Sequence, residues 1–117
     1  MVKKIGTSNP SLKNLIRELK RLSNKEKVNI WRRIAKDLAK PTRIRRRVNI
    51  YKIDKYTRND ETAIVPGKVL SLGELNKKIT VAAYQFSDAA KKKIPNAITI
   101  QQLMKNNPKG KKVRIIG

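Results

Sequence analysis

The sequence predicts a mixed α/β protein: an N-terminal helical hairpin and a basic loop, followed by an irregular domain of short alternating strands and helices. Two patterns support this. Apolar residues recur at helical spacing in the first third of the chain, and later short β-branched runs alternate with short helical patterns, bounded by Pro, Gly and Asn. We expect a single domain (1–117) made of a hairpin (1–40), a basic segment (41–58) and an α/β core (59–117).

The first helix is predicted to begin at Asn9-Pro10, because Asn is a good N-cap and Pro fits the first helical position. Its apolar face consists of Leu12, Leu15, Ile16, Leu19 and Leu22. Ser23 and Glu26 form a capping-box pattern, which predicts that a second helix starts there and that Pro41 ends it.

One half of the second helix is apolar, and the other half is mostly basic. The apolar half contains Val28, Ile30, Trp31, Ile34, Ala35, Leu38 and Ala39. Since Trp31 lies well inside this half, we expect it to pack against Leu15 and Leu19 of the first helix. The sequence therefore predicts a core role for Trp31 and not a base-stacking role.

The next segment is dense in positive charge. From Lys40 to Arg58 it holds eight basic residues and a single acid, Asp54. We expect 41–47 to be an extended basic loop. After it, either Asn49 caps a short helix that carries Ile50 and Ile53, or a strand runs through Val48 and Ile50.

The rest of the chain reads as short elements separated by turn residues. The expected strands are 62–65, ended by Pro66-Gly67; 68–72, closed by Gly73; 79–86; 98–100; and 113–116. The expected helices are 88–94, capped by Ser87 and broken by Pro95-Asn96, and a helix that starts at Thr99 or Ile100 and runs through Lys105 to a stop at Asn107-Pro108.

Composition argues against most enzyme classes. The chain has no His and no Cys, which removes the commonest general bases and nucleophiles, disulfides and zinc fingers. Its eight acids are scattered, and only Asp60 and Glu61 are adjacent. We expect no catalysis, no cofactor or metal, and no small-molecule substrate.

Nothing in the sequence suggests a membrane protein. No apolar stretch approaches the roughly 20 residues that span a bilayer. Residues 1–6 do not resemble a secretory signal, because no apolar run follows Lys3 and Lys4. We expect a cytoplasmic protein.

Positive charge is the strongest functional signal. Thirty Lys and Arg against eight Asp and Glu give a formal net charge of +22 in 117 residues. Such a chain repels itself, and nucleic acid is the usual partner that relieves the repulsion. The basic clusters occur in every quarter of the chain and do not centre on one recognition helix, which favours contacts on many faces of a folded RNA.

The predicted RNA-binding residues follow these clusters. They are Lys3, Lys4, Lys13, Arg32, Arg33, Lys40, Arg43, Arg45, Arg46, Arg47, Lys52, Lys55, Arg58, Lys68, Lys77, Lys78, Lys109, Lys111, Lys112 and Arg114. Gly67 and Gly73 either let the backbone approach a phosphate beside Lys68 or form plain turns.

Several segments resemble a known family over nearly the whole chain. They are VPGKVLSLGEL (65–75), ITVAAYQFS (79–87), Asn9-Pro10, 15–20, Trp31-Arg32, Val48-Asn49, Asn107-Pro108 and VRIIG (113–117). With these, the chain resembles large-ribosomal-subunit protein eighteen of the archaeal and eukaryotic type, which is related to bacterial large-subunit protein fifteen. It departs from the resemblance at 94–97, where relatives often carry a Gly-rich turn.

The resemblance implies an α/β protein that scaffolds large-subunit ribosomal RNA without catalysis. Its expected partners are this RNA and neighbouring large-subunit proteins, and we do not expect a homo-oligomer. Two alternatives remain from the residues alone: a free DNA-compacting or chromatin-type protein, which the same charge would suit, and a small enzyme acting on acidic substrates.

Overall fold

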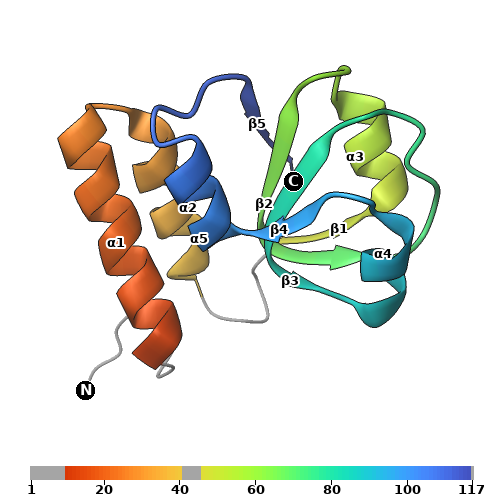
Figure 1. The fold of residues 1–117 in the computed structure, drawn as a ribbon. Helices are drawn as coiled ribbons and strands as arrows, with labels where there is room; N and C mark the ends of the chain where they lie inside the picture. Colours follow the sequence, from red (N-terminus) through yellow and green to blue (C-terminus); the bar gives the residue numbers. More distant parts are fainter. Residues whose placement is uncertain (1–9, 41–45, 117) are drawn as a thin grey trace.

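The computed structural model describes residues 10–40 and 46–116; residues 1–9, 41–45 and 117, and the side chain of Arg46, lie outside this description. The described chain folds into three layers, with helices on both faces of one sheet (Figure 1). In order, the elements are α1 (Pro10–Glu26), α2 (Asn29–Leu38), β1 (Arg46–Asn49), α3 (Ile50–Tyr56), β2 (Thr62–Leu70), β3 (Thr80–Phe86), α4 (Asp88–Lys93), β4 (Ala97–Thr99), α5 (Ile100–Asn106) and β5 (Val113–Ile115). The predicted α/β class is confirmed.

The helical hairpin is present, but its turn lies later than predicted. α1 continues through Ser23, and α2 begins after Val28 without a side-chain cap. The Ser23 hydroxyl is buried and donates a 2.6 Å hydrogen bond to the carbonyl of Val28, so it braces the turn instead of capping a helix. The turn itself depends on Lys27, which adopts a positive φ of 57°.

Trp31 closes the hairpin as predicted. Its side chain is fully buried and belongs to one apolar cluster with Leu15 and Leu19. The indole N–H also donates a 2.7 Å hydrogen bond to the carbonyl of Pro108. The sequence pattern did not indicate this last contact, which joins α2 to the turn after α5.

All pairings in the described sheet are parallel, and β2 is its centre. β3 runs along one side of β2, and β4 pairs with the far side of β3. On the other side of β2, β5 pairs with the first half and β1 with the second half, so β1 and β5 lie end to end.

The prediction that Pro66-Gly67 ends a strand is wrong. β2 runs through both residues, and the sequence-predicted strands 62–65 and 68–72 form one strand of nine residues. Between Val65 and Lys68 the register with β3 shifts, because three steps along β2 face two steps along β3. Pro66 and Gly67 therefore form a β-bulge, which absorbs the missing N–H of Pro66 without breaking the strand.

Side chains alternate between the two faces of the sheet. Ile64 and Ala82 face the cluster formed with α1, α2 and α5. Their neighbours on the same strands face the cluster formed with α3 and α4; these are Ala63, Val65, Val81 and Ala83. Since both faces are covered there, the paired middle of the inner strands, 63–65 of β2 and 81–83 of β3, is apolar on both faces, as is typical of parallel sheets.

Each alternative for the segment after the basic loop is right in part: Val48 lies in a strand that ends before Ile50, and Ile50 and Ile53 lie in a helix that Asn49 does not cap. A strand, β1, occupies Arg46–Asn49 and leads directly into α3. The predicted loop 41–47 is therefore wrong at its end, because Arg46 and Arg47 pair with Gly67 and Lys68 of β2. Asn49 precedes α3 but does not cap it with its side chain, which instead accepts a 3.2 Å hydrogen bond from the N–H of Leu72.

The predicted cap at Ser87 is confirmed: its hydroxyl accepts a 3.1 Å hydrogen bond from the N–H of Ala90 at the start of α4. Of the two predicted starts of the next helix, Ile100 is the first helical residue, and Thr99 is its N-cap and forms a full capping box with Gln102. The bounds of α4 and α5 differ from the predicted ones by at most one residue, as expected for helix ends.

Candidate nucleic-acid interface

Four predicted RNA-binding residues, Lys3, Lys4, Arg43 and Arg45, lie outside the described residues. Arg46 is described only through its backbone in β1. The remaining predicted residues lie on four parts of the surface.

The outer side of α2 forms the first part. Arg32, Arg33, Lys36 and Lys40 are exposed there, and we call these four residues the α2 basic face. They line a shallow groove of about 510 Å³ together with Asn29 and Asp37. Lys40 lies 3.3 Å from the carboxylate of Asp37. Helical spacing from Arg32 and Arg33 indicates Lys36 as well, which the sequence prediction left out. Lys13 is exposed on α1.

The second part is the turn 107–112 between α5 and β5, which we call the lysine turn. Three predicted residues, Lys109, Lys111 and Lys112, are exposed on it. The side chain of Asn107 ties the turn together: its amide donates to the carbonyl of Lys111 at 2.8 Å and accepts from the N–H of Lys111 at 3.1 Å.

The lysine turn is fixed against the start of α2. Trp31 of α2 donates its indole N–H to the carbonyl of Pro108. Gly110 has a φ of 66°, and a Cβ placed on it would lie 2.9 Å from a methyl carbon of Ile30. Figure 1 shows the chain after α5 passing over the hairpin. The α2 basic face and the lysine turn, which are far apart in sequence, therefore lie on adjoining elements.

The third part surrounds α3. Lys55 and Arg58 are exposed, and the Lys55 ammonium lies 5.4 Å from the centre of the Tyr56 ring. Lys52, which is half-buried, and Tyr56 line a cleft of about 360 Å³ with Arg114 and the end of β5. A cation beside a half-exposed aromatic ring suits both a phosphate and a base.

Arg114 is engaged within the protein. Its guanidinium binds Glu61 with three hydrogen bonds of 3.0–3.2 Å, and Glu61 also accepts a 2.6 Å bond from the N–H of Arg58. The hydrogen bond from Arg114, followed by that from Arg58, lowers the pKa of Glu61, and Glu61 in turn raises the pKa of Arg114. Glu61 thus offsets the positive charge of Arg114 within the protein.

Lys77 also has an internal role. Its ammonium donates hydrogen bonds to the carbonyls of Asp54 and Thr57 at the end of α3. A cation is favourable at a helix C-terminus, where carbonyls have no partner within the helix. Neighbouring Lys78 is exposed. The assignments of Lys77 and Lys78 as RNA-binding residues stay predictions.

The fourth part is the carboxyl edge of the sheet. Arg47 of β1 is exposed, and its register partner Lys68 of β2 is half-buried beside a pocket of about 430 Å³. The two glycines here have structural roles. Gly67 lies within the β2 bulge, and a Cβ on Gly73, whose φ is 101°, would lie 2.6–2.9 Å from atoms of Tyr51. The plain structural interpretation of Gly73 is therefore favoured.

Other kinds of site find no support in the part of the chain that the structure describes. No group of three or more acidic, His or Cys residues there is placed to hold a metal ion. None of the described helices combines the length and the apolar character needed to cross a membrane.

The family model described as ribosomal proteins 50S-L15 and 50S-L18e and one protein of the 60S subunit matches residues 11–97. The chain belongs to this ribosomal protein family. Curated relatives named large ribosomal subunit protein eL18 come from Methanoregula boonei, 45% identical over 120 residues, and Methanothermobacter thermautotrophicus, 42% identical over 120 residues; each alignment covers 99% of both chains. The Haloarcula marismortui relative of the same name is 42% identical over 115 residues, 96% of this chain and 99% of the relative. The family resemblance seen in the sequence is confirmed.

Proposed function

We propose that this protein is a structural, non-catalytic constituent of the large ribosomal subunit in the cytoplasm. In this role it binds folded large-subunit ribosomal RNA through phosphate and 2′-hydroxyl contacts, next to other large-subunit proteins. Membership of the family and the names of the relatives support the ribosomal part of the proposal. They do not favour the alternative of a free DNA-compacting protein.

The observation that carries the RNA-binding mode is that α2, which carries the α2 basic face, also holds the lysine turn through buried Trp31 and half-buried Ile30. Seven cations from two distant segments therefore lie on adjoining elements; they are Arg32, Arg33, Lys36, Lys40, Lys109, Lys111 and Lys112. Cations spread over adjoining elements in this way neutralise several phosphates and do not require a particular base.

Salt dependence of binding tests this mode. If about ten cations engage phosphates, the logarithm of the binding constant should fall against the logarithm of salt concentration with a slope of roughly −7 to −9. Filter binding to deproteinised large-subunit ribosomal RNA measures this slope. A slope shallower than about −3 on this RNA contradicts a phosphate-dominated interface.

A pair of triple variants locates the interface. Replacing Arg32, Arg33 and Lys36 by Ser removes three cations of the α2 basic face and should make the slope shallower by about 2. The matched control replaces Arg17, Lys20 and Arg21, three exposed cations of α1, by Ser. Equal changes in the two variants would show that the α2 basic face has no special part in binding.

A further inference from the structure

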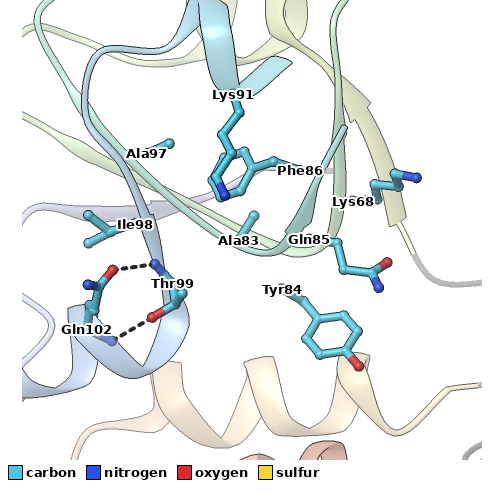
Figure 2. Close-up of a pocket in the computed structure, with 10 residues that line it drawn as sticks. All are labelled: Lys68, Ala83, Tyr84, Gln85, Phe86, Lys91, Ala97, Ile98, Thr99 and Gln102. Atoms are coloured by element: carbon cyan, nitrogen blue, oxygen red, sulfur yellow. Dashed lines mark hydrogen bonds between the residues drawn. The ribbon is translucent and has the colours of Figure 1, made fainter. Parts of the chain in front are cut away.

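We propose that the pocket beyond the carboxyl ends of β3 and β4 binds one unpaired nucleotide of the RNA. This inference rests on the proposed RNA-binding function and adds a defined site to it. The pocket has a volume of about 430 Å³, within the usual range for ligand sites. The lining residues that matter are Lys68, Tyr84, Gln85, Phe86, Lys91 and Gln102 (Figure 2).

The topology of the sheet creates this pocket. β4 pairs with Val81–Ala83 and ends at Thr99, whereas β3 continues to Phe86. Beyond the end of β4, the last residues of β3 therefore border open space. This explains why residues 84–86 line the pocket.

The connections after the two strands leave on opposite faces of the sheet. α4, which follows β3, contributes Ala90 to the cluster on one face, and α5, which follows β4, contributes Ile100 and Leu103 to the cluster on the other. A crevice between adjacent strands whose connections diverge is the usual binding place in open parallel sheets. The pocket occupies this switch point.

The chemistry of the lining matches a nucleotide. Lys68 and Lys91 supply positive charge, and none of the residues that line the pocket is an acid. The Phe86 ring lies beside Lys91, whereas the Tyr84 ring packs against the cluster on the other face of the sheet (Figure 2). Phosphate suits the cations, and an unstacked base suits one of the two rings. The side-chain amides of Gln85 and Gln102 add hydrogen-bonding groups of the kind that contact base edges.

One wall of the pocket is held in place. The side-chain oxygen of Gln102 accepts a 2.9 Å hydrogen bond from the N–H of Thr99, and the N–H of Gln102 donates to the Thr99 hydroxyl at 3.1 Å. Figure 2 shows this pair on one side of the pocket and Lys91 descending from α4 toward Phe86. A fixed wall reduces the conformational entropy lost on binding.

The two cations favour a nucleotide within a chain over a free one. Lys68 comes from β2 and Lys91 from α4, and they lie on different sides of the pocket in Figure 2: Lys91 extends over Phe86, whereas Lys68 lies beyond Gln85 with its ammonium directed outward. A nucleotide in RNA carries a phosphate on each side of its sugar, so one cation can serve each phosphate. A free mononucleotide offers one phosphate group and would leave the second cation without a partner.

Ultraviolet crosslinking followed by peptide mapping tests the site directly. The full chain is irradiated in complex with the large-subunit ribosomal RNA of its own organism, and trypsin then releases residues 79–91, which contain both aromatic rings of the pocket. We expect a nucleotide adduct on Tyr84 or Phe86. Adducts on peptides of α2 or of the lysine turn, with none in 79–91, would overturn the proposal while leaving RNA binding intact.

Matched variants give a second readout. Lys91→Ala removes one of the two pocket cations, and Lys92→Ala removes an exposed neighbour on the same helix that does not line the pocket. Gln85→Ala removes one of the two amides that line the pocket. We expect Lys91→Ala and Gln85→Ala to weaken RNA binding more than Lys92→Ala does, with the double variant losing roughly 10-fold or more, because it removes a phosphate contact and a hydrogen-bonding group. Equal losses in the Lys91 and Lys92 variants would refute the site.

A mononucleotide titration separates the two sources of the ligand. If uridine or adenosine monophosphate shifts the amide NMR signals of Gln85 and Gln102 while the pocket variants bind RNA normally, the site belongs to a free nucleotide and the proposal is wrong. Failure of the proposed function looks different, because the unaltered protein would then show no salt-dependent binding to ribosomal RNA at all.

Discussion

Replacing Trp31 tests the packing of the hairpin on the rest of the protein. Its side chain is fully buried between α1 and α2, and its indole N–H bonds the carbonyl of Pro108 at 2.7 Å. A buried aromatic side chain removes about 150–250 Å² from water, which corresponds to an upper bound of about 4–6 kcal/mol. Large-to-small core substitutions of Trp cost about 3–5 kcal/mol. We therefore expect Trp31→Ala to lower the free energy of unfolding by about 4 kcal/mol.

A less drastic variant separates packing from hydrogen bonding. Trp31→Phe keeps most of the apolar contact but loses the donor to Pro108, so we expect a loss of about 1–2 kcal/mol. Arg33→Ala, an exposed change on the same helix, serves as control and should stay within about 0.5 kcal/mol.

Urea and thermal unfolding followed by circular dichroism measure these changes. For a chain of this size, a loss of about 4 kcal/mol lowers the melting temperature by more than about 10 °C. A Trp31→Ala protein that melts within about 3 °C of the unaltered protein would show that the burial argument is wrong. RNA affinity of Trp31→Phe should match that of the unaltered protein, and strong quenching of Trp31 fluorescence by RNA would instead place the ring against the nucleic acid.

Two further predictions concern charged groups. Because the hydrogen bond from Arg114 lowers the pKa of Glu61, the folded state favours its carboxylate; the resulting stabilisation is complete above the ordinary pKa of 4.5 and is lost as the pH falls through the lowered folded value. The urea midpoint of the unaltered protein should therefore decline as the pH falls through this range, and Glu61→Gln should remove the part of the decline that Glu61 causes. A decline of the same size in Glu61→Gln would count against the ion pair. Lys77→Met should lower the free energy of unfolding by about 1–2 kcal/mol, because two carbonyls at the end of α3 lose their donor. Its RNA affinity should change less than that of Lys78→Met, and the reverse order in filter binding would show that Lys77 serves mainly the RNA.

Local signals in the sequence predicted much of the secondary structure. Ser87 caps α4 as expected, since a hydroxyl followed by free helical N–H groups acts within one turn. Trp31 was placed in the core because helical periodicity alone assigns it to the apolar face. The family, too, was evident from contiguous segments such as 65–75 and 79–87, and the comparisons confirm it.

The sequence prediction was wrong at two places where a local pattern is compatible with more than one structure. Ser23 followed by Glu26 has the form of a capping box, yet Ser23 stays inside α1 and bonds the carbonyl of Val28. Pro66-Gly67 has the form of a turn, yet pairing with β3 carries the strand through it as a bulge. In both cases tertiary packing outweighed a local preference of about 1 kcal/mol.

The sequence by itself determined the charge, the amphipathic hairpin, the α/β class and the family, because each is written in composition or in spacing along the chain. Only the tertiary structure decided which basic segments lie on adjoining elements. The Trp31–Pro108 hydrogen bond joins residues 77 positions apart and sets the lysine turn against α2. Two further cations are engaged within the protein, which the sequence did not indicate. Arg114 forms an ion pair with Glu61, and Lys77 donates to carbonyls at the end of α3. Such contacts depend on chain segments meeting in space, and no local periodicity specifies them.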